Sequence, residues 1–228
     1  MTEKTERLGL AALKLVYPTR AVCMGCDSQA GFSREWLCDD CRRELAKRWV
    51  GAAPPPGGSG IDGAAYAYLY GGPAGGMVRH MKYQGVKRLA DPMARAMASA
   101  LALIQPTGAE CVVPVPMHPK RLRERGFNHA ALLARKLGGL AGLPEREALA
   151  RIRNTPQQAR LSEEERRANM TDAFAAAEPV AGKRILLVDD VCTTGATVAD
   201  CARALKQAGA AAVYLVCFAT ANHGEDGV

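Results

Sequence analysis

Two patterns of hydrophobic residues alternate along this chain. Short runs of consecutive aliphatic residues, such as residues 185–188, are typical of strands covered on both faces of a parallel sheet. Elsewhere, as in residues 196–207, the pattern is that of an amphipathic helix. Strands that alternate with helices predict an α/β fold with a mostly parallel sheet and right-handed crossovers. The expected strands are residues 64–70, 111–115, 148–153, 173–176, 184–188 and 211–219, and the expected helices are a short one ending at 83, then 91–104, 128–140 and 196–207.

Residues 51–60 are the one evident linker, because Gly-Ala-Ala-Pro-Pro-Pro-Gly-Gly-Ser-Gly sustains neither helix nor sheet. The linker divides the chain into an N-terminal unit, residues 1–50, and a main domain, residues 61–228. Apolar residues near the start recur at helical spacing and predict an N-terminal helix packed on the body. In the main domain, Asp91 and Pro92 are typical of the N-cap and first position of a helix.

The formal net charge of +7 is concentrated in three clusters, around residues 79–88, 120–125 and 151–167. A run of charge is usually a solvated face, but two of these clusters lie on expected loops, which favours an anionic ligand. No apolar run is long enough to span a bilayer, so we expect no transmembrane segment. Acidic residues near the start and the lack of a small-residue cleavage site argue against a secretory signal.

Four cysteines form two Cys-x-x-Cys knuckles in about twenty residues, a spacing typical of zinc sites. Four thiolates satisfy a tetrahedral Zn²⁺ ion and leave no position for water, so the predicted role is structural. Disulfides are the alternative. Because thiols stay reduced inside the cell, zinc ligation favours a cytoplasmic protein. The predicted ligands are Cys23, Cys26, Cys38 and Cys41.

Residues 184–197 carry the most specific pattern in the chain: a buried strand, two aspartates, a loop of small residues and a helix. Backbone amides at the helix N-terminus, hydroxyl groups and a glycine that permits close approach predict a phosphate site. Asp189 and Asp190 stand where they can accept hydrogen bonds from two adjacent ribose hydroxyls. The alternative is an ordinary turn with solvated aspartates. The predicted phosphate loop consists of Thr193, Thr194, Gly195, Ala196 and Thr197.

This stretch resembles the signature of the type I phosphoribosyltransferases. The resemblance implies that the two aspartates contact the ribose of 5-phosphoribosyl 1-pyrophosphate and that residues 193–197 wrap its 5′-phosphate. Neither of the rival phosphate motifs, G-x-x-x-x-G-K-[ST] or G-x-G-x-x-G after a strand, is present. The expected fold is therefore a type I phosphoribosyltransferase-like sheet flanked by helices, with a small four-cysteine knuckle in front.

Residues 114–128, the block from 153 to 174 and the double knuckle are similar to the ComF/GntX family of competence-associated phosphoribosyltransferase-like proteins. The likeness covers residues 16–218, with His129 standing where that family usually has Gln. It implies Mg²⁺ bound with the ligand, a pyrophosphate loop that contains Lys120, Arg121 and a catalytic Arg125, and a mobile segment over residues 154–171. It also implies an acceptor-binding hood over about residues 61–105. From the mobile segment we expect Arg160 and Arg166 to reach the ligand.

Two hypotheses about function follow from the resemblance. In the first, the protein transfers phosphoribose to an unidentified amine or nucleobase, with Asp189, Asp190 and Arg125 as catalytic residues. In the second, it is a non-catalytic module that senses phosphoribosyl pyrophosphate and binds single-stranded DNA during uptake, together with proteins of the competence machinery. Release of pyrophosphate would indicate the first, and an affinity for DNA that falls steeply with salt would indicate the second.

Overall fold

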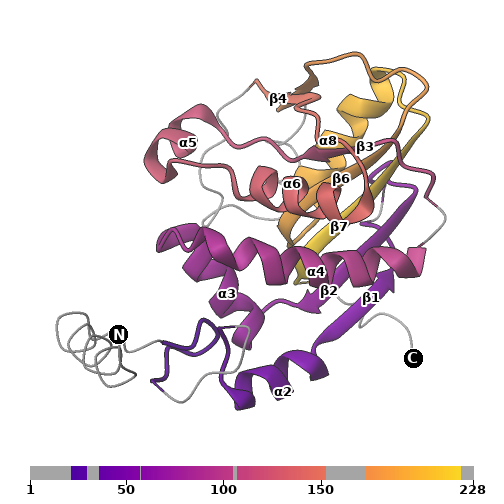
Figure 1. Ribbon diagram of the computed structural model, residues 1–228. Coiled ribbons are helices and arrows are strands. Elements are labelled where there is room, and N and C mark those ends of the chain that lie inside the picture. Colours follow the sequence, from indigo (N-terminus) through magenta and orange to yellow (C-terminus); the bar gives the residue numbers. More distant parts are fainter. Residues whose placement is uncertain (1–21, 30–35, 57, 105–106, 153–172, 222–228) are drawn as a thin grey trace, which may run out of the picture.

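The computed structural model describes residues 22–29, 36–56, 58–104, 107–152 and 173–221 (Figure 1). The predicted N-terminal helix lies outside them, as do Arg160 and Arg166. In this part of the chain no helix is long and apolar enough to cross a bilayer. The elements in order are α2 (Asp39–Lys47), β1 (Trp49–Ala53), β2 (Gly63–Leu69), α3 (Gly72–Tyr83), a 3₁₀ turn (Lys87–Leu89), α4 (Ala90–Leu101), a second 3₁₀ turn (Ala102–Ile104), β3 (Cys111–Pro114), α5 (Pro119–Arg125), α6 (His129–Ala141), β4 (Leu149–Arg151), β5 (Phe174–Ala176), β6 (Arg184–Cys192), α8 (Ala196–Gln207) and β7 (Ala212–Thr220).

A five-stranded sheet in the order β1-β2-β7-β6-β3 forms the centre of the molecule. The pairs β2–β7, β7–β6 and β6–β3 are parallel, and only the edge strand β1 is antiparallel to its neighbour. The predicted mostly parallel sheet is therefore confirmed. The short strands β4 and β5 pair with each other in a separate two-stranded sheet.

Helices cover both faces of the large sheet. Alternate residues of its strands face opposite sides, as the two-residue period of a strand requires. Val188 and its neighbours on one face belong to a core cluster with Met97 of α4 and Leu137 of α6. Leu187 and its neighbours on the other face pack with Leu205 of α8. Figure 1 shows α4 and α6 in front of the sheet and α8 behind it, so the consecutive aliphatic run of β6 reflects burial on both sides.

Two local predictions differ from the structure near the linker and at α4. Residues 51–53, assigned to the linker, form the second half of β1, and Gly51 pairs with Tyr66 of β2. Their small side chains fit an edge strand, and the prolines follow only at residue 54. Helix α4 starts at Ala90, so Asp91 lies within its first turn and is not the N-cap. Asp91 instead lies 2.8 Å from Lys136 Nζ of α6.

The basic segment after β3, which we expected to be a loop, is the short helix α5. His118 is its N-cap, and the ring Nδ1 accepts a hydrogen bond from the Lys120 amide at 3.2 Å. Pro119 occupies the first helical position, and Gly126 ends the helix with φ = 77°. Proline at the start and glycine at the end are helix signals that the sequence contains. The loop was predicted because of the cluster of positive charges between these residues.

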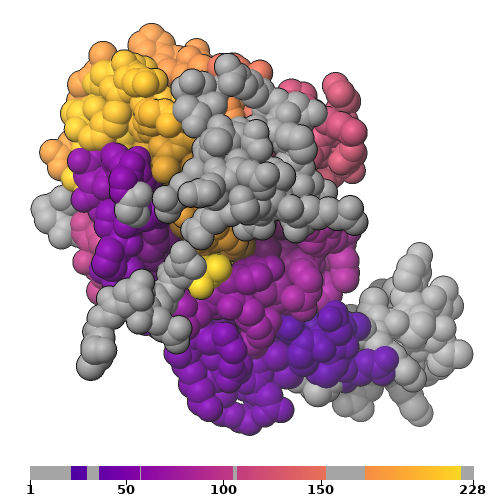
Figure 2. Space-filling view, turned by 180° about the vertical axis from the view of Figure 1, so that it is seen from behind, coloured from indigo at the N-terminus to yellow at the C-terminus, as the bar shows by residue number. Residues whose placement is uncertain are grey.

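The cysteine knuckle packs directly on α3 at one end of the molecule (Figures 1 and 2). Cys23 and Leu37 of the knuckle belong to the same core cluster as Met77 and Met81 of α3. At the contact, a Cβ built on Gly76 would lie 2.1 Å from the carbonyl oxygen of Gly25. The knuckle and α3 are thus backbone-to-backbone neighbours with a shared core.

We expect Gly76→Ala to destabilise the protein by about 1 to 3 kcal/mol, because the new methyl group must push the knuckle off α3. Urea unfolding measures the loss. Gly139→Ala in α6 is the matched control, since a Cβ there meets nothing within 4 Å. That change should stabilise the helix by about 0.5 to 1 kcal/mol. Equal effects at the two glycines would contradict the close contact.

Candidate functional site

A pocket of about 390 Å³ opens at the carboxyl ends of β3 and β6. Ligands of open α/β sheets generally bind at this end. The structure brings together here six residues that the sequence singled out, from two separate segments of the chain. These are Arg121, Arg125, Asp189, Asp190, Thr193 and Thr197.

The acidic pair lies in the second half of β6, which extends four residues beyond the predicted end. Asp190 is buried, and its carboxylate Oδ2 lies 2.7 Å from Lys82 Nζ of α3. Burial alone would lower the pKa of Lys82, but the charge of Asp190 and its hydrogen bond raise it above its ordinary value. Burial and the neighbouring charge of Asp190 raise the pKa of Asp189 well above its usual range, although Lys82 opposes this. Asp189 therefore holds its proton to a higher pH than a free aspartate does.

The predicted phosphate loop joins β6 to α8. A smaller hollow of about 50 Å³ is lined by Thr193 to Thr197 and shares Asp189 with the larger pocket. Gly195 is the N-cap of α8 with φ = 80°, and a Cβ there would lie 2.3 Å from Pro56 Cβ. Glycine has no side chain to cap the helix, and the Ala196 amide donates to Thr194 Oγ1 at 3.5 Å, so the loop hydroxyls and the start of α8 line the same hollow. This arrangement is a ready site for a phosphate group.

Positive side chains form part of the pocket wall. Lys82, Arg121, Arg125 and Arg151 all line it. Burial and the nearby charge of Arg121 lower the pKa of Arg151, so these two cations repel each other in the absence of an anion. Lys120, the other cation predicted for this wall, is exposed on α5 and is not one of the described residues that line the pocket. The wall has the charge that a polyanion requires.

Lys82, Arg151 and His129 are pocket residues that the sequence did not assign to the site. The signal for Lys82 and Arg151 was their place in two of the basic clusters. His129 follows Asn128, which caps α6 by accepting the Ala130 amide at 3.1 Å and donates to the Val115 carbonyl at 3.0 Å. This link between β3 and α6 sets His129 in the pocket wall.

His129 is only 2% exposed, and within the described part of the chain its Nε2 has no hydrogen-bond partner. Burial is the main cause that lowers its pKa to about 4; the charges of Lys82 and Arg125 act in the same direction, and the charge of Asp190 opposes them. The imidazole is therefore neutral at pH 7. It offers an uncharged group beside the acidic pair.

His129 should make the protein lose stability in acid. The unfolded chain binds a proton on this residue below about pH 6.5, whereas the folded protein binds it only below about 4, so stability falls as the pH drops through this window. The expected loss is about 3 kcal/mol at the acidic end. Urea unfolding at pH 7, 5.5 and 4 should show this slope, and His129→Gln should remove most of it. An identical slope in the variant would contradict the neutral buried histidine.

A second hollow, of about 730 Å³, adjoins the first and shares Lys82, Arg121 and Arg125 with it. Its other walls include Tyr83, which is 69% exposed, and Phe127. The Arg125 guanidinium lies 5.1 Å from the centre of the Tyr83 ring. Aromatic faces next to cations can bind planar rings by stacking.

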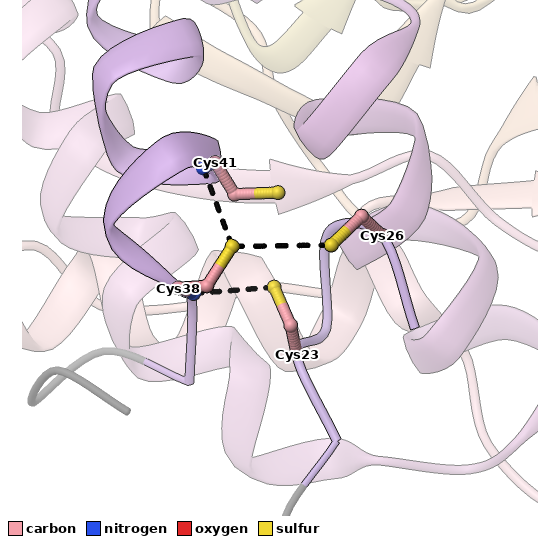
Figure 3. Close-up of side chains that lie close together, drawn as sticks. All are labelled: Cys23, Cys26, Cys38 and Cys41. Atoms are coloured by element: carbon pink, nitrogen blue, oxygen red, sulfur yellow. Dashed lines mark hydrogen bonds between the residues drawn. The ribbon is translucent and has the colours of Figure 1, made fainter. Parts of the chain in front are cut away.

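The four predicted cysteine ligands point toward one another, at the start of α2 and in the turn before it (Figure 3). Their sulfur atoms all lie within 4.8 Å of one another, and Cys26 Sγ and Cys38 Sγ are 3.9 Å apart. Tetrahedral Zn²⁺ with Zn–S bonds of about 2.3 Å places sulfur atoms about 3.8 Å apart, whereas a disulfide requires about 2.05 Å.

Backbone amides also face the sulfur atoms of this cluster. Cys38 N–H donates to Cys23 Sγ at 3.2 Å, and Gly25 N–H donates to the same sulfur at 3.4 Å. Such bonds stabilise thiolates. All eight cysteines of the chain are free thiols, which removes the disulfide alternative. The cluster fits a structural zinc ion.

Comparison with known proteins agrees with this geometry. The sequence profile of the phosphoribosyl transferase domain matches residues 122–227. The chain is 31% identical to the DNA utilization protein YhgH of Escherichia coli (strain K12), covering 86% of this chain and 88% of that protein. It is 27% identical to competence protein ComFC of Bacillus subtilis (strain 168), over 88% of this chain and 84% of that protein. It is 25% identical to competence protein F of Haemophilus influenzae, over 82% of this chain and 91% of that protein. These matches, the fold and the cysteine cluster together show that the chain belongs to the ComF/GntX family of phosphoribosyltransferase-like proteins.

Proposed function

We propose that this protein binds 5-phosphoribosyl 1-pyrophosphate with Mg²⁺ and transfers its phosphoribosyl group to an acceptor. The observation that carries the proposal is a pair of adjoining hollows, sharing Asp189, that bring together the acidic pair, the phosphate loop and four cationic side chains. Each part matches one part of the ligand: the ribose, the 5′-phosphate and the pyrophosphate.

In the proposed complex, Asp189 and Asp190 accept hydrogen bonds from the two ribose hydroxyls and fix the sugar ring. The 5′-phosphate sits against the first amides of α8, with Thr193, Thr194 and Thr197 donating from their hydroxyls. The pyrophosphate lies toward Arg121 and Arg125, whose planar guanidinium groups grip phosphate oxygens in pairs. Arg160 and Arg166 stay predicted contributors from the segment outside the described residues.

The reaction breaks the bond between the anomeric carbon and the pyrophosphate oxygen, and the acceptor forms a new bond to that carbon. Positive charge develops on the sugar while negative charge leaves with pyrophosphate. Asp189 and Asp190 are the carboxylates that would hold Mg²⁺ together with the ligand, and the ion would supply charge neutralisation of the leaving pyrophosphate. Arg121, Arg125 and Lys82 add fixed positive charge on the same side, so the wall stabilises charge where it develops.

For the acceptor we propose the second hollow, which lies across Lys82 and Arg125 from the sugar pocket. Tyr83 and Phe127 offer ring faces there, and Gln84 and Glu124 offer polar groups that a nitrogen heterocycle can pair with. We expect Tyr83→Ala to weaken acceptor binding about tenfold, because stacking on one aromatic ring contributes about 1 to 3 kcal/mol. Affinity for phosphoribosyl pyrophosphate should change much less, since Tyr83 does not line the sugar pocket and touches it only through Arg125.

Calorimetry with phosphoribosyl pyrophosphate and Mg²⁺ tests the binding, and an acceptor screen on the same sample, read as pyrophosphate release, tests the transfer. A soaked crystal provides the structural check. No heat of binding at millimolar ligand, or a ligand-soaked pocket that contains only solvent, would refute the proposal. Binding with no turnover for any acceptor would refute the transfer alone.

We also propose that the cysteine cluster holds one structural Zn²⁺ ion. Four sulfur ligands leave no site for substrate or water on such an ion, so its contribution is to folding. Ligation requires reduced thiols, and the cytoplasm stays the predicted compartment on that ground.

A second candidate function is single-stranded DNA binding linked to phosphoribosyl pyrophosphate, with competence-machinery proteins as partners. It is favoured by the names of the relatives, which refer to DNA utilization and competence. The exposed Tyr83 ring beside Arg125 is the kind of surface on which unpaired bases stack. The test is affinity for an oligonucleotide against salt: a logarithmic slope near zero, unchanged when Lys120, Arg121 and Arg123 are neutralised, would reject this function.

A further inference from the structure

We propose that the cysteine knuckle has a role beyond its own folding: through α3 it positions Lys82 as a ligand-contacting residue of the sugar-phosphate pocket. In this scheme Asp27 and His80 are positioning residues that touch no ligand. The inference rests on the proposed function and adds to it a reason for the knuckle and the pocket to occur in one chain.

On one side, α3 is fixed to the knuckle by a polar contact between buried His80 and the partly exposed Asp27. His80 is 4% exposed, and its Nε2 lies 2.8 Å from Asp27 Oδ1, one residue after the cysteine ligand Cys26. Its other ring nitrogen, Nδ1, lies 2.7 Å from Gln84 Oε1. The backbone contact between Gly76 and Gly25 lies on the same side of the helix. Translation or rotation of α3 would break both contacts.

On the other side, the same turn of α3 reaches into the pocket. Lys82 follows His80 by two residues, so its side chain leaves the helix about 200° further round. Its ammonium group lies 2.7 Å from Asp190 Oδ2, and the side chain is 22% exposed. One helical turn therefore touches the knuckle with one face and the acidic pair with the other.

The position of Lys82 matters because the acidic pair faces a ligand that is itself a polyanion. An ammonium group has three donors and a carboxylate has about four acceptor sites, so the contact with Asp190 leaves both groups able to bind the ligand. Lys82 also offsets the negative charge that Asp190 would otherwise turn toward the phosphates. A lysine has a long flexible stem, and it can do this with little loss of entropy only if its backbone is held still.

The test is a double-mutant cycle on the full-length protein, with affinity for phosphoribosyl pyrophosphate and Mg²⁺ measured by calorimetry. Asp27 has φ = 62°, so Asp27→Gly removes the carboxylate without straining the backbone. Asp27→Asn, which tolerates this conformation and keeps an acceptor oxygen, is the matched control. His80→Phe keeps the ring and removes both nitrogens, and it provides a second variant if Asp27→Gly fails to retain its metal.

We expect Lys82→Ala to weaken binding by about ten- to a hundredfold, and Asp27→Gly to weaken it by about three- to tenfold. Asp27→Asn should bind like the unchanged protein. In the Lys82→Ala background, Asp27→Gly should have no further effect beyond about twofold, because the knuckle acts through Lys82. If Asp27→Gly weakens binding equally in both backgrounds, or if Lys82→Ala tightens binding, the inference is overturned.

A second measurement reads the position of Lys82 without any ligand. A lysine ammonium that is ion-paired and shielded gives an observable ¹H–¹⁵N signal, and Lys82→Ala identifies it. The signal should be lost in Asp27→Gly and kept in Asp27→Asn, while both retain one metal ion per chain. Absence of ligand binding in the unchanged protein would refute the proposed function, whereas an unchanged ammonium signal in Asp27→Gly would refute the positioning.

Discussion

Asp190→Asn should weaken binding of phosphoribosyl pyrophosphate by about a hundredfold and stop any transfer, because it removes charge-assisted hydrogen bonds to the ribose. The same change should destabilise the free protein. Lys82 Nζ lies 2.7 Å from the lost carboxylate, and its ammonium group would stay partly buried without a counter-charge. We expect a loss of about 1 to 3 kcal/mol in the free energy of unfolding. Calorimetry and urea unfolding at pH 7 measure the two effects.

Asp189→Asn should also weaken ligand binding, but it should raise the stability of the free protein. Burial and the charge of Asp190 raise the pKa of Asp189, so the folded protein keeps a proton that the unfolded chain releases above about pH 3.9. Stability is therefore lost as the pH rises from that value toward the folded pKa. The amide of Asn carries no charge at any of these pH values, so the variant does not undergo this loss. It should therefore unfold at a higher urea concentration than the unchanged protein at pH 7, and the two should unfold at the same concentration near pH 3.

Asp91→Asn is the control for both changes, since Asp91 is a half-exposed carboxylate paired with Lys136 away from the pocket. It should leave ligand affinity unchanged and alter stability by less than about 1 kcal/mol. If Asp189→Asn and Asp190→Asn change stability in the same direction, the division of roles between the two carboxyl groups is wrong.

The parts of the site that lie close together in the sequence could be predicted from it. The strand, the acidic pair, the phosphate loop and α8 are contiguous, and their order alone placed Asp189 beside Gly195 at the end of a buried strand. The same holds for the cysteines, whose spacing predicted a common ligand cluster. In both cases short-range chain geometry determines which side chains meet.

Lys82 and Arg151 are pocket residues whose place in the site could not be predicted from the sequence. Each reaches the pocket from an element far from β6 in the sequence. Its distance from the acidic pair depends on how α3 and the β4–β5 sheet pack against the core. Both residues belong to basic clusters in the sequence, but the sequence does not distinguish them from neighbouring cations that face solvent. The helix α5 was predicted as a loop for a different reason: its cap residues His118, Pro119 and Gly126 are helix signals, but they flank a run of mostly positive charges that is also typical of loops.

Loss of the metal should have the largest effect on stability of any change considered. Zinc binding by four cysteines contributes about 10 to 16 kcal/mol to the folding of small zinc modules. Here the knuckle also covers the buried residues Met77 and Met81 of α3, which belong to the same core cluster as Cys23. We therefore expect Cys23→Ser to lose the metal, expose α3 and lower the melting temperature by more than about 10 °C. Native mass spectrometry and thermal unfolding measure these effects.

Cys111→Ala is the control for this change, because Cys111 is buried in β3 far from the cluster and acts as a small apolar residue. It should retain one metal ion per chain and lose only about 1 kcal/mol. Hydrogen exchange after addition of a chelator tests whether the metal also stabilises α3. If it does, exchange should rise in the knuckle and in α3 together, before it rises in the sheet. Exchange that rises in the knuckle alone, with α3 still protected, would show that the helix does not depend on the metal and that their shared core contributes little.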